Sequence, residues 1–146
     1  MTTRAAINSL CVILTVLLFS CSRPQSYETF VKAADAPGGV YSYQLDLSDS
    51  LASYDISFYS RVDRNSLNVR NEYPQIRLEV TWVSPSGQNF SETVYMRGSN
   101  SAGDIQKYRS GVVPRESGEW TLKVKAFPGE GKFRGLGVIC RRNGTR

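Results

Sequence analysis

Apolar and polar residues alternate along several short segments of this chain, as expected for strands that bury one face. The alternation is clearest in 76–83 and 119–126, is also present in 54–62, and is less regular in 40–47. We predict a strand over each of these four ranges. Trp82 and Trp120 fall in phase with the aliphatic residues of their strands, so we expect both to pack in the core.

Turn residues delimit further strands. Ser84-Pro85-Ser86-Gly87 places proline second and glycine fourth in a turn, which predicts a hairpin to a strand at about 89–97. Glu92 is in phase with the apolar residues of that strand, so we expect a bulge or a later strand start there. We predict a weak strand over 105–113 and, after the turn Pro128-Gly129-Glu130-Gly131, a final strand at about 134–141. No segment has a convincing helical pattern. We therefore predict an all-β fold, a single antiparallel β-sandwich of about seven to eight strands over 40–142.

The first residues have the pattern of a secretion signal. Arg4 precedes a run, 10–19, that is apolar apart from Thr15 and is too short to span a bilayer, which needs about 20 residues. Leu18-Phe19-Ser20-Cys21 then resembles a bacterial lipobox. That resemblance implies a lipoprotein signal peptide over 1–20, with Cys21 acylated and anchored in a membrane. A plain signal peptide or an uncleaved anchor with an incidental cysteine is the alternative.

The segment from 21 to 39 contains Pro24, Pro37 and Gly38-Gly39, and we expect it to be a lipidated N-terminus with a flexible tether. Residues 143–146 are expected to form a basic tail. If the leader is removed with Cys11 and Cys21 is acylated, Cys140 has no cysteine to pair with. We expect Cys140 to be a small buried hydrophobic residue.

The composition restricts the chemistry. The chain has no histidine, which excludes a histidine general base and histidine metal ligands. We found no phosphate-binding loop, dinucleotide fingerprint or nucleophile elbow, so we predict no catalytic residue, no metal site, no cofactor and no enzymatic activity. The net charge is +5, and removing the leader with its single charge at Arg4 leaves +4. This charge is too small and dispersed to predict nucleic-acid binding.

Two groups of residues are candidates for surface contacts. The last third of the chain is basic, and a basic patch there would meet anionic lipid head groups or an acidic partner. A solvated face with lysines that protect strand edges is the alternative. Tyr59 and Tyr95 fall in the polar phase of their strands and are the candidate exposed aromatic residues. The basic candidates are Lys123, Lys125, Lys132, Arg134, Arg141 and Arg142.

Most of the predicted mature chain resembles the gliding-motility lipoproteins of the GldH type. The matching segments are SFYSRVDRN at 57–65, YPQIRLEVTWVSPSGQ at 73–88, SGEWTLKVKA at 117–126 and RGLGVICRR at 134–142. The resemblance implies a lipoprotein of the Bacteroidota-type cell envelope, linked to gliding or to the associated secretion apparatus. Such bacteria often mark surface-exported lipoproteins with an acidic run after the lipidated cysteine. Ser22-Arg23-Pro24-Gln25-Ser26 has none, so we predict a domain that faces the periplasm.

These features together predict a non-enzymatic, membrane-anchored envelope lipoprotein that acts as a protein-interaction module on another envelope protein. Anchoring would raise its local concentration near such a partner. A glycan-binding β-sandwich that uses Tyr59 or Tyr95 is the alternative, by analogy with other sandwiches.

Overall fold

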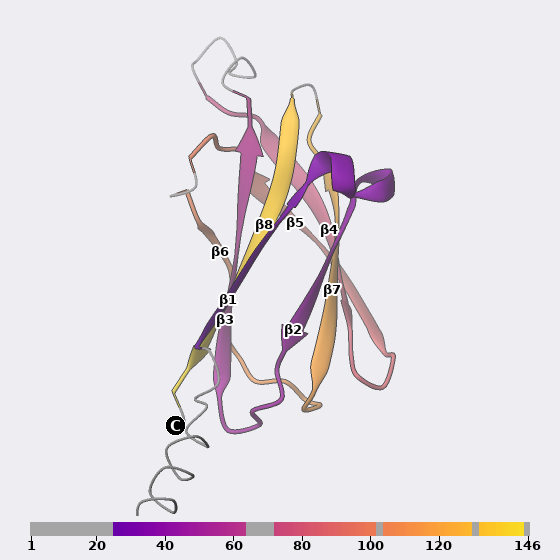
Figure 1. Cartoon of the computed structure of the whole chain (residues 1–146), viewed down its shortest axis with the longest axis vertical. Coiled ribbons are helices and arrows are strands. Elements are labelled where there is room, and N and C mark those ends of the chain that lie inside the picture. Colours follow the sequence, from indigo (N-terminus) through magenta and orange to yellow (C-terminus); the bar gives the residue numbers. More distant parts are fainter. Residues whose placement is uncertain (1–24, 64–71, 102–103, 130–131, 145–146) are drawn as a thin grey trace, which may run out of the picture.

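The computed structural model describes residues 25–63, 72–101, 104–129 and 132–144, and the predicted leader and Cys21 lie outside the described residues. The described residues form eight strands in two antiparallel four-stranded sheets that face each other (Figure 1). The predicted β-sandwich is therefore confirmed. Within this part of the chain the only helical segments are two short 3-10 turns, and no helix is long and apolar enough to cross a bilayer.

The two sheets have different strand orders. Sheet A has the order β1-β8-β3-β6 and sheet B the order β2-β7-β4-β5, so β6 and β5 are free edges on one side of the sandwich and β1 and β2 on the other. The strands of sheet A are β1 (Ser26–Lys32), β3 (Ser53–Val62), β6 (Gln106–Val112) and β8 (Phe133–Asn143). Those of sheet B are β2 (Val40–Asp46), β4 (Gln75–Val83), β5 (Asn89–Arg97) and β7 (Glu119–Phe127).

The core lies between the sheets and is built from the alternating apolar residues of both inner faces. Leu78 and Val80 of β4 and Leu122 and Val124 of β7 are completely buried. One polar contact crosses this core, because the buried Tyr43 hydroxyl donates a hydrogen bond of 2.7 Å to the backbone oxygen of Leu136 in the opposite sheet. Burial raises the pKa of Tyr43, so the phenol stays protonated and can donate.

The predicted flexible tether over 21–39 is wrong from Ser26 onward. Ser26–Lys32 forms strand β1, which pairs with β8 over its whole length, and two 3-10 turns, Ala33–Asp35 and Pro37–Gly39, lead into β2. Pro37, Gly38 and Gly39, which suggested a tether, belong to this connection, whereas Pro24 lies outside the described residues. The strand was missed because its side chains are only partly buried, so the apolar alternation is weak. The domain therefore begins near residue 25 rather than 40.

Strand β5 contains no bulge, contrary to our expectation. It pairs with β4 without a register shift from Gln75 opposite Arg97 to Val83 opposite Asn89. The connecting turn is the predicted one: Gly87 donates to the oxygen of Ser84 at 2.9 Å and adopts a φ of 87°, and Ser84 donates to the oxygen of Gln88 at 2.9 Å. This is a three-residue hairpin loop whose last residue needs the left-handed conformation that glycine allows.

Candidate functional site

An open groove of about 480 Å³ lies between the free edges of β5 and β6. We call it the β5–β6 groove. Its lining is mostly apolar and comes from both sheets and from the segment that follows β6. Phe90 and Val113 on its rim are 46% and 57% exposed. The apolar lining residues are Leu47, Trp82, Phe90, Val112, Val113, Pro114 and Trp120, and the polar ones are Ser91, Glu92, Arg109 and Arg115.

A chain of hydrogen bonds joins the two sheets at one wall of the groove. The indole nitrogen of Trp82 donates to the Tyr108 hydroxyl at 2.9 Å, and that hydroxyl donates to a carboxylate oxygen of Glu92. The other carboxylate oxygen of Glu92 lies 2.6 Å from Arg109 Nη2. The Glu92 carboxylate can point inward because Tyr108 and Arg109 supply its hydrogen bonds. This explains why Glu92 lies on the same face as the apolar residues of β5 although the strand has no bulge. The sequence shows the anomaly at Glu92 but not its partners, which come from the other sheet.

The electrostatics of this wall follow from these bonds. Hydrogen bonding to Arg109, together with that to Tyr108, holds the pKa of Glu92 below its usual value. Burial and the bond to Glu92 raise the pKa of Tyr108 to about 12. Glu92 is therefore ionised and compensated by Arg109, whereas the exposed Arg115 on the same groove makes no ion pair with a described residue. The lining therefore carries one uncompensated positive charge.

The two tryptophans divide between core and groove. Trp120 is 7% exposed and donates from its indole nitrogen to the oxygen of Glu116 at 2.9 Å, so its predicted core position is confirmed. Trp82 is only partly buried and lies against Trp120 edge to face, with ring centroids 6.1 Å apart. Trp82 thus combines a packing contact with a surface in the groove, which its phase along β4 alone could not reveal.

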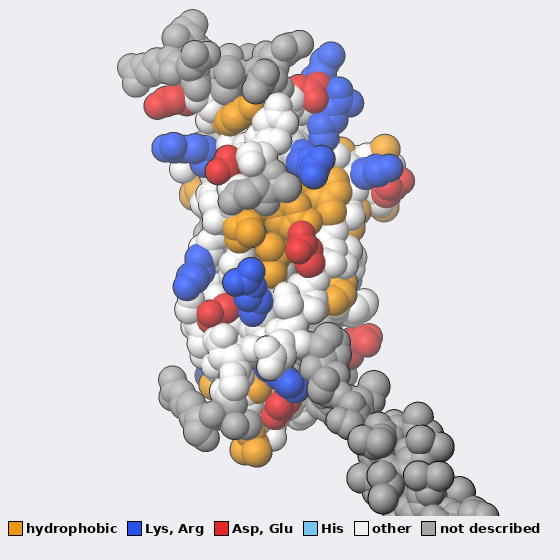
Figure 2. All heavy atoms as spheres, turned by 60° about the vertical axis from the view of Figure 1, so that its left-hand side comes forward, with side chains coloured by type: hydrophobic (Ala, Val, Ile, Leu, Met, Phe, Trp, Pro, Cys, Tyr) orange, Lys and Arg blue, Asp and Glu red, His pale blue; other side chains and the backbone are white. Residues whose placement is uncertain are grey.

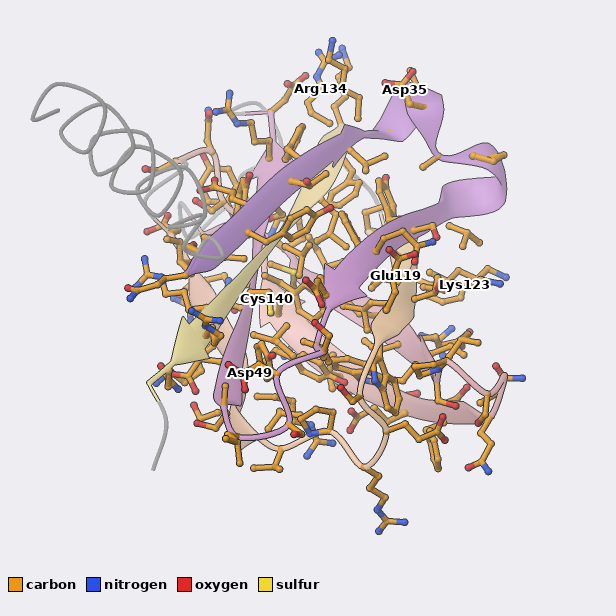
Figure 3. All side chains as sticks on the ribbon, turned by 60° about the horizontal axis from the view of Figure 1, so that its bottom comes forward. Asp35, Asp49, Glu119, Lys123, Arg134 and Cys140 are labelled. Atoms are coloured by element: carbon orange, nitrogen blue, oxygen red, sulfur yellow. The ribbon has the colours of Figure 1, made fainter. Side chains whose placement is uncertain are left out.

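Cys140 is buried between the sheets, as the sequence predicts (Figure 3). Burial raises the pKa of its thiol to about 11. A thiol in this state is a poor nucleophile at neutral pH because almost none of it is thiolate. Among the described residues no group of three or more cysteines and carboxylates is arranged to hold a metal ion.

The predicted basic patch does not form. Lys123 and Lys125 lie on β7 in sheet B, whereas β8 lies in sheet A, paired with β1 and β3, so the two strands are not neighbours. Arg134 and Arg141 stand at opposite ends of β8, about 23 Å apart at the rise of an extended strand. Figure 3 shows Lys123 and Arg134 at well-separated places, and Figure 2 shows basic and acidic side chains interspersed on another face.

Two of the predicted basic residues are also neutralised. Arg134 makes a two-pronged contact with Asp63, at 2.7 Å from Nε and 2.6 Å from Nη2. Arg142 lies 3.3 Å from a carboxylate oxygen of Asp49. Lys123, Lys125, Lys132 and Arg141 are exposed. These residues are close in sequence, but the chain crosses from sheet B to sheet A between β7 and β8, so they do not share a face.

Tyr59 is not an exposed aromatic residue, contrary to our expectation, because it is only 5% exposed. Its phase was right, since it lies on the outward face of sheet A, but the side chain of Phe30 from β1 packs against it there. Phe30, Gly137 and Tyr59 stand side by side across β1, β8 and β3. Because Gly137 has no side chain, the ring of Tyr59 lies over it, and this ring stacks on the ring of Phe30 with centroids 5.8 Å apart. Burial and a hydrogen bond to Glu28 raise the pKa of Tyr59 to about 12.

Tyr95 is 62% exposed on β5, as predicted. Its side chain lies on the outward face of sheet B, because its neighbours in sequence, Val94 and Met96, are the residues that face the core side. Tyr95 therefore does not line the groove, although it belongs to the same strand as Phe90 and Glu92. The two predicted aromatic residues are thus on different sheets and do not form one surface.

No family model matches this sequence, and no curated protein matches it. Solved structures that resemble the chain include the crystal structure of a protein from Sulfurospirillum deleyianum, with a TM-score of 0.47 and 9% identity, covering 83% of this chain and 99% of that chain. Another is the crystal structure of PirA, with a TM-score of 0.39 and 11% identity, covering 86% and 99% of the two chains. Likenesses at this level carry no argument about function.

Proposed function

We propose that this protein is a non-enzymatic lipoprotein of a bacterial cell envelope whose β-sandwich binds another envelope protein. The observation that carries the binding role is the β5–β6 groove, an opening with a mostly apolar lining between two sheet edges. Phe90 and Val113 both line this groove and are exposed apolar side chains. Apolar surface of this kind on a folded domain is typical of a contact site.

The membrane anchor in this proposal rests on the sequence alone. The apolar run ending in Leu18-Phe19-Ser20-Cys21 supports acylation of Cys21, and two or three acyl chains hold a protein stably on a membrane. The resemblance of residues 57–65, 73–88, 117–126 and 134–142 to the GldH-type lipoproteins supports a link to gliding motility or its secretion apparatus. The lack of an acidic run after Cys21 supports a periplasm-facing domain.

The anchor is tested by replacing Cys21. We expect Cys21→Ser to abolish incorporation of a clickable fatty acid and to leave an uncleaved precursor, whereas Cys140→Ser keeps both labelling and cleavage because Cys140 is buried. Fatty-acid labelling that persists in Cys21→Ser would show that the lipobox interpretation is wrong. Membrane fractionation of the two variants gives an independent measurement of anchoring.

The binding role is tested by chemical cross-linking in cells that express the full lipoprotein, followed by mass spectrometry. We expect one reproducible envelope protein in the cross-linked species. Monomers without any reproducible adduct would contradict the binding role while leaving the anchor intact, because anchoring is measured separately by acyl labelling.

A glycan-binding module is the second candidate, and the groove supplies a specific reason to consider it. An aromatic ring and a charged pair, Trp82 with Glu92 and Arg109, occur together there, and sugars bind to such combinations by stacking and hydrogen bonding. Tyr59 cannot take part because it is buried. Binding on a glycan array that is lost in Trp82→Ala or in Tyr95→Ala would favour this function over a protein partner.

A further inference from the structure

The free edge of β5 has a row of backbone groups that point away from the protein. In the hairpin, Ser84 bonds to Gln88, so residues bonded to β4 alternate with residues whose N–H and C=O face outward. The register places the outward-facing N–H and C=O groups on every second residue of β5, namely Asn89, Ser91, Thr93, Tyr95 and Arg97. Their side chains are exposed, as expected for the outer face of sheet B.

One side chain of the protein already binds this edge as a strand would. The side-chain oxygen of Gln106 accepts from the backbone N–H of Arg97 at 2.9 Å, and its amide nitrogen donates to the backbone oxygen of Arg97 at 2.6 Å. The Gln106 amide thus imitates a peptide group of an added strand at the last outward-facing residue. Ser91, Thr93 and Tyr95, further along the same edge, have no such partner among the described residues.

The other edge on this side of the sandwich is protected, and β5 is not. Strand β6 carries Lys107 and Arg109, and its pairing with β3 is interrupted by register shifts between Lys107 and Val112. Charges and irregularities of this kind discourage the addition of a strand. Strand β5 has regular pairing over nine residues, and its one inward charge, Glu92, is compensated by Arg109. Its edge is therefore suited to a partner strand.

We propose that the β5 edge binds an extended segment of the partner protein by strand addition. The segment has a large apolar side chain and, two residues away, a carboxylate. Side chains two apart on a strand lie on one face, so both would enter the β5–β6 groove. The apolar side chain contacts Phe90, Trp82 and Val113, and the carboxylate meets the uncompensated Arg115. Backbone bonds supply affinity and the groove supplies specificity.

This inference rests on the proposed function and names how the partner binds. It is tested in the full lipoprotein, in its native cells, with the photo-cross-linker p-benzoylphenylalanine at Ser91 or Tyr95. Matched positions of similar exposure are Ser42 on the free edge of β2 and Lys123 on the face of β7. We expect the β5 positions to give an adduct at least fivefold stronger than the matched positions.

Two substitutions separate edge pairing from groove contact. Thr93→Pro removes a backbone N–H that faces outward, so the ladder with β4 keeps its bonds and the fold should survive. We expect it to abolish the Tyr95 adduct. Arg115→Glu reverses the uncompensated charge and should reduce the adduct at least fivefold, while Arg141→Glu, an exposed arginine of sheet A, leaves it unchanged. If Thr93→Pro unfolds in a thermal melt, Arg115→Glu decides alone.

The identity of the adduct decides between occupants. Mass spectrometry of the Ser91 adduct should map to a segment of another protein with an apolar residue two positions from an acid. An adduct between two copies of this chain, or an adduct insensitive to Arg115→Glu, would overturn the inference. Adducts at Ser42 or Lys123 without any at β5 would also overturn it but keep the proposed function. Absence of adducts at all positions, with no partner by general cross-linking, would contradict the proposed function itself.

Discussion

Gly137 of β8 is paired with Phe30 of β1 on one side and with Tyr59 of β3 on the other, and the ring of Tyr59 lies over it on the outward face of sheet A. A Cβ atom added at Gly137 would lie 2.1 Å from Cζ of Tyr59 and 2.3 Å from its Cε1. We therefore expect Gly137→Ala to lower the free energy of unfolding by about 1–3 kcal/mol, the usual cost of forcing extra atoms into a packed site. Urea denaturation at pH 7 measures it.

The three atoms nearest to this added Cβ are all outer ring atoms of Tyr59, which offers a matched control. Tyr59→Leu lacks those atoms, so Gly137→Ala should cost less than about 0.5 kcal/mol in the Tyr59→Leu background. An equal loss of unfolding free energy in both backgrounds would show that glycine is needed for the backbone conformation and not for contact with the Tyr59 ring. The packing of the Tyr59 ring over a strand glycine would then not explain why glycine occupies this position.

The Glu92 carboxylate should make stability depend on acid pH. Its folded-state pKa is lowered, first by the hydrogen bond to Arg109, so its contribution is present above the usual pKa of 4.5 and is lost as the pH falls through the folded value. We expect Glu92→Gln to lower the unfolding free energy by about 1 kcal/mol at pH 7. The difference from the native protein should narrow between pH 5 and pH 3.

A carboxylate on the neighbouring strand provides the control for this pH dependence. Glu79 is 45% exposed and contacts Arg77 at 3.4 Å, a surface pair that contributes little. Glu79→Gln should therefore retain the acid dependence of the native protein. A Glu92→Gln curve that runs parallel to the native curve from pH 7 to pH 3 would contradict the role given to Glu92.

At the scale of elements, β1 completes sheet A and contributes Phe30, which packs against Tyr59. A soluble form that begins at Val40, where the sequence placed the start of the domain, lacks the seven residues that pair with β8. We expect its melting temperature to fall by at least about 10 °C relative to a form that begins at Ser22, since each kcal/mol corresponds to several degrees in a domain of this size. Thermal unfolding followed by circular dichroism measures the difference.

The control for this truncation begins at Gln25, whose backbone oxygen accepts from Arg142 at 2.7 Å. It retains β1 and should melt within about 2 °C of the form that begins at Ser22, because the residues removed lie outside the strand. A form beginning at Val40 that melts at the same temperature as both would mean that β1 adds nothing to the stability of the sandwich.

Each of the seven strands that we predicted can be recognised from its own residues, either by side-chain alternation or by the turn residues that flank it. Strands β4 and β7, with residues such as Leu78 and Val124 completely buried, have the clearest patterns because they lie in the middle of sheet B. Strand β1 lies at an edge and buries little, so its strand conformation depends on β8, more than a hundred residues away. Local patterns cannot show a strand whose main cause is such a distant partner.

The same limit applies to the candidate site. The sequence marks Glu92 as out of phase, yet Tyr108 and Arg109, which satisfy it, come from the other sheet. The groove exists because β5 and β6 are edges on the same side of the sandwich, a fact of strand order that periodicity does not contain. Residues whose surroundings come from their own strand were predictable, and residues whose surroundings come from sheet order were not.

For the whole molecule, dispersed charge predicts weak attraction to anionic membranes. Lys123 and Lys125 are exposed on β7, but Arg134 and Arg142 are paired with acids and lie on the other sheet. If the two lysines bound lipid head groups, removing both would cost about 2 kcal/mol, or roughly 30-fold. We expect Lys123→Gln with Lys125→Gln to change vesicle binding of a non-acylated form less than about twofold, measured by co-sedimentation with phosphatidylglycerol vesicles.

The corrected start of the domain also limits the distance between the sandwich and a membrane in which Cys21 is anchored. If Cys21 is acylated, only Ser22, Arg23 and Pro24 separate it from Gln25, which bonds to Arg142. Extended residues span at most about 3.6 Å each, so four steps reach about 14 Å. The sandwich is longer, since the ten residues of β3 alone extend about 33 Å. One end of the sandwich must therefore stay close to the bilayer.

The end near the bilayer should be the one that carries the β2–β3 connection, because Asp49 in that connection contacts Arg142. Leu51 there is 73% exposed, and Figure 3 shows Asp35 at the far end from Asp49. We expect a fluorophore on Leu51→Cys, in an acylated Cys140→Ala background, to be quenched by spin-labelled lipid at least threefold more than one on Asp35→Cys. Inserting about ten flexible residues after Pro24 should reduce this difference. Equal quenching at both ends before the insertion would mean that the chain does not hold the domain against the membrane by this end.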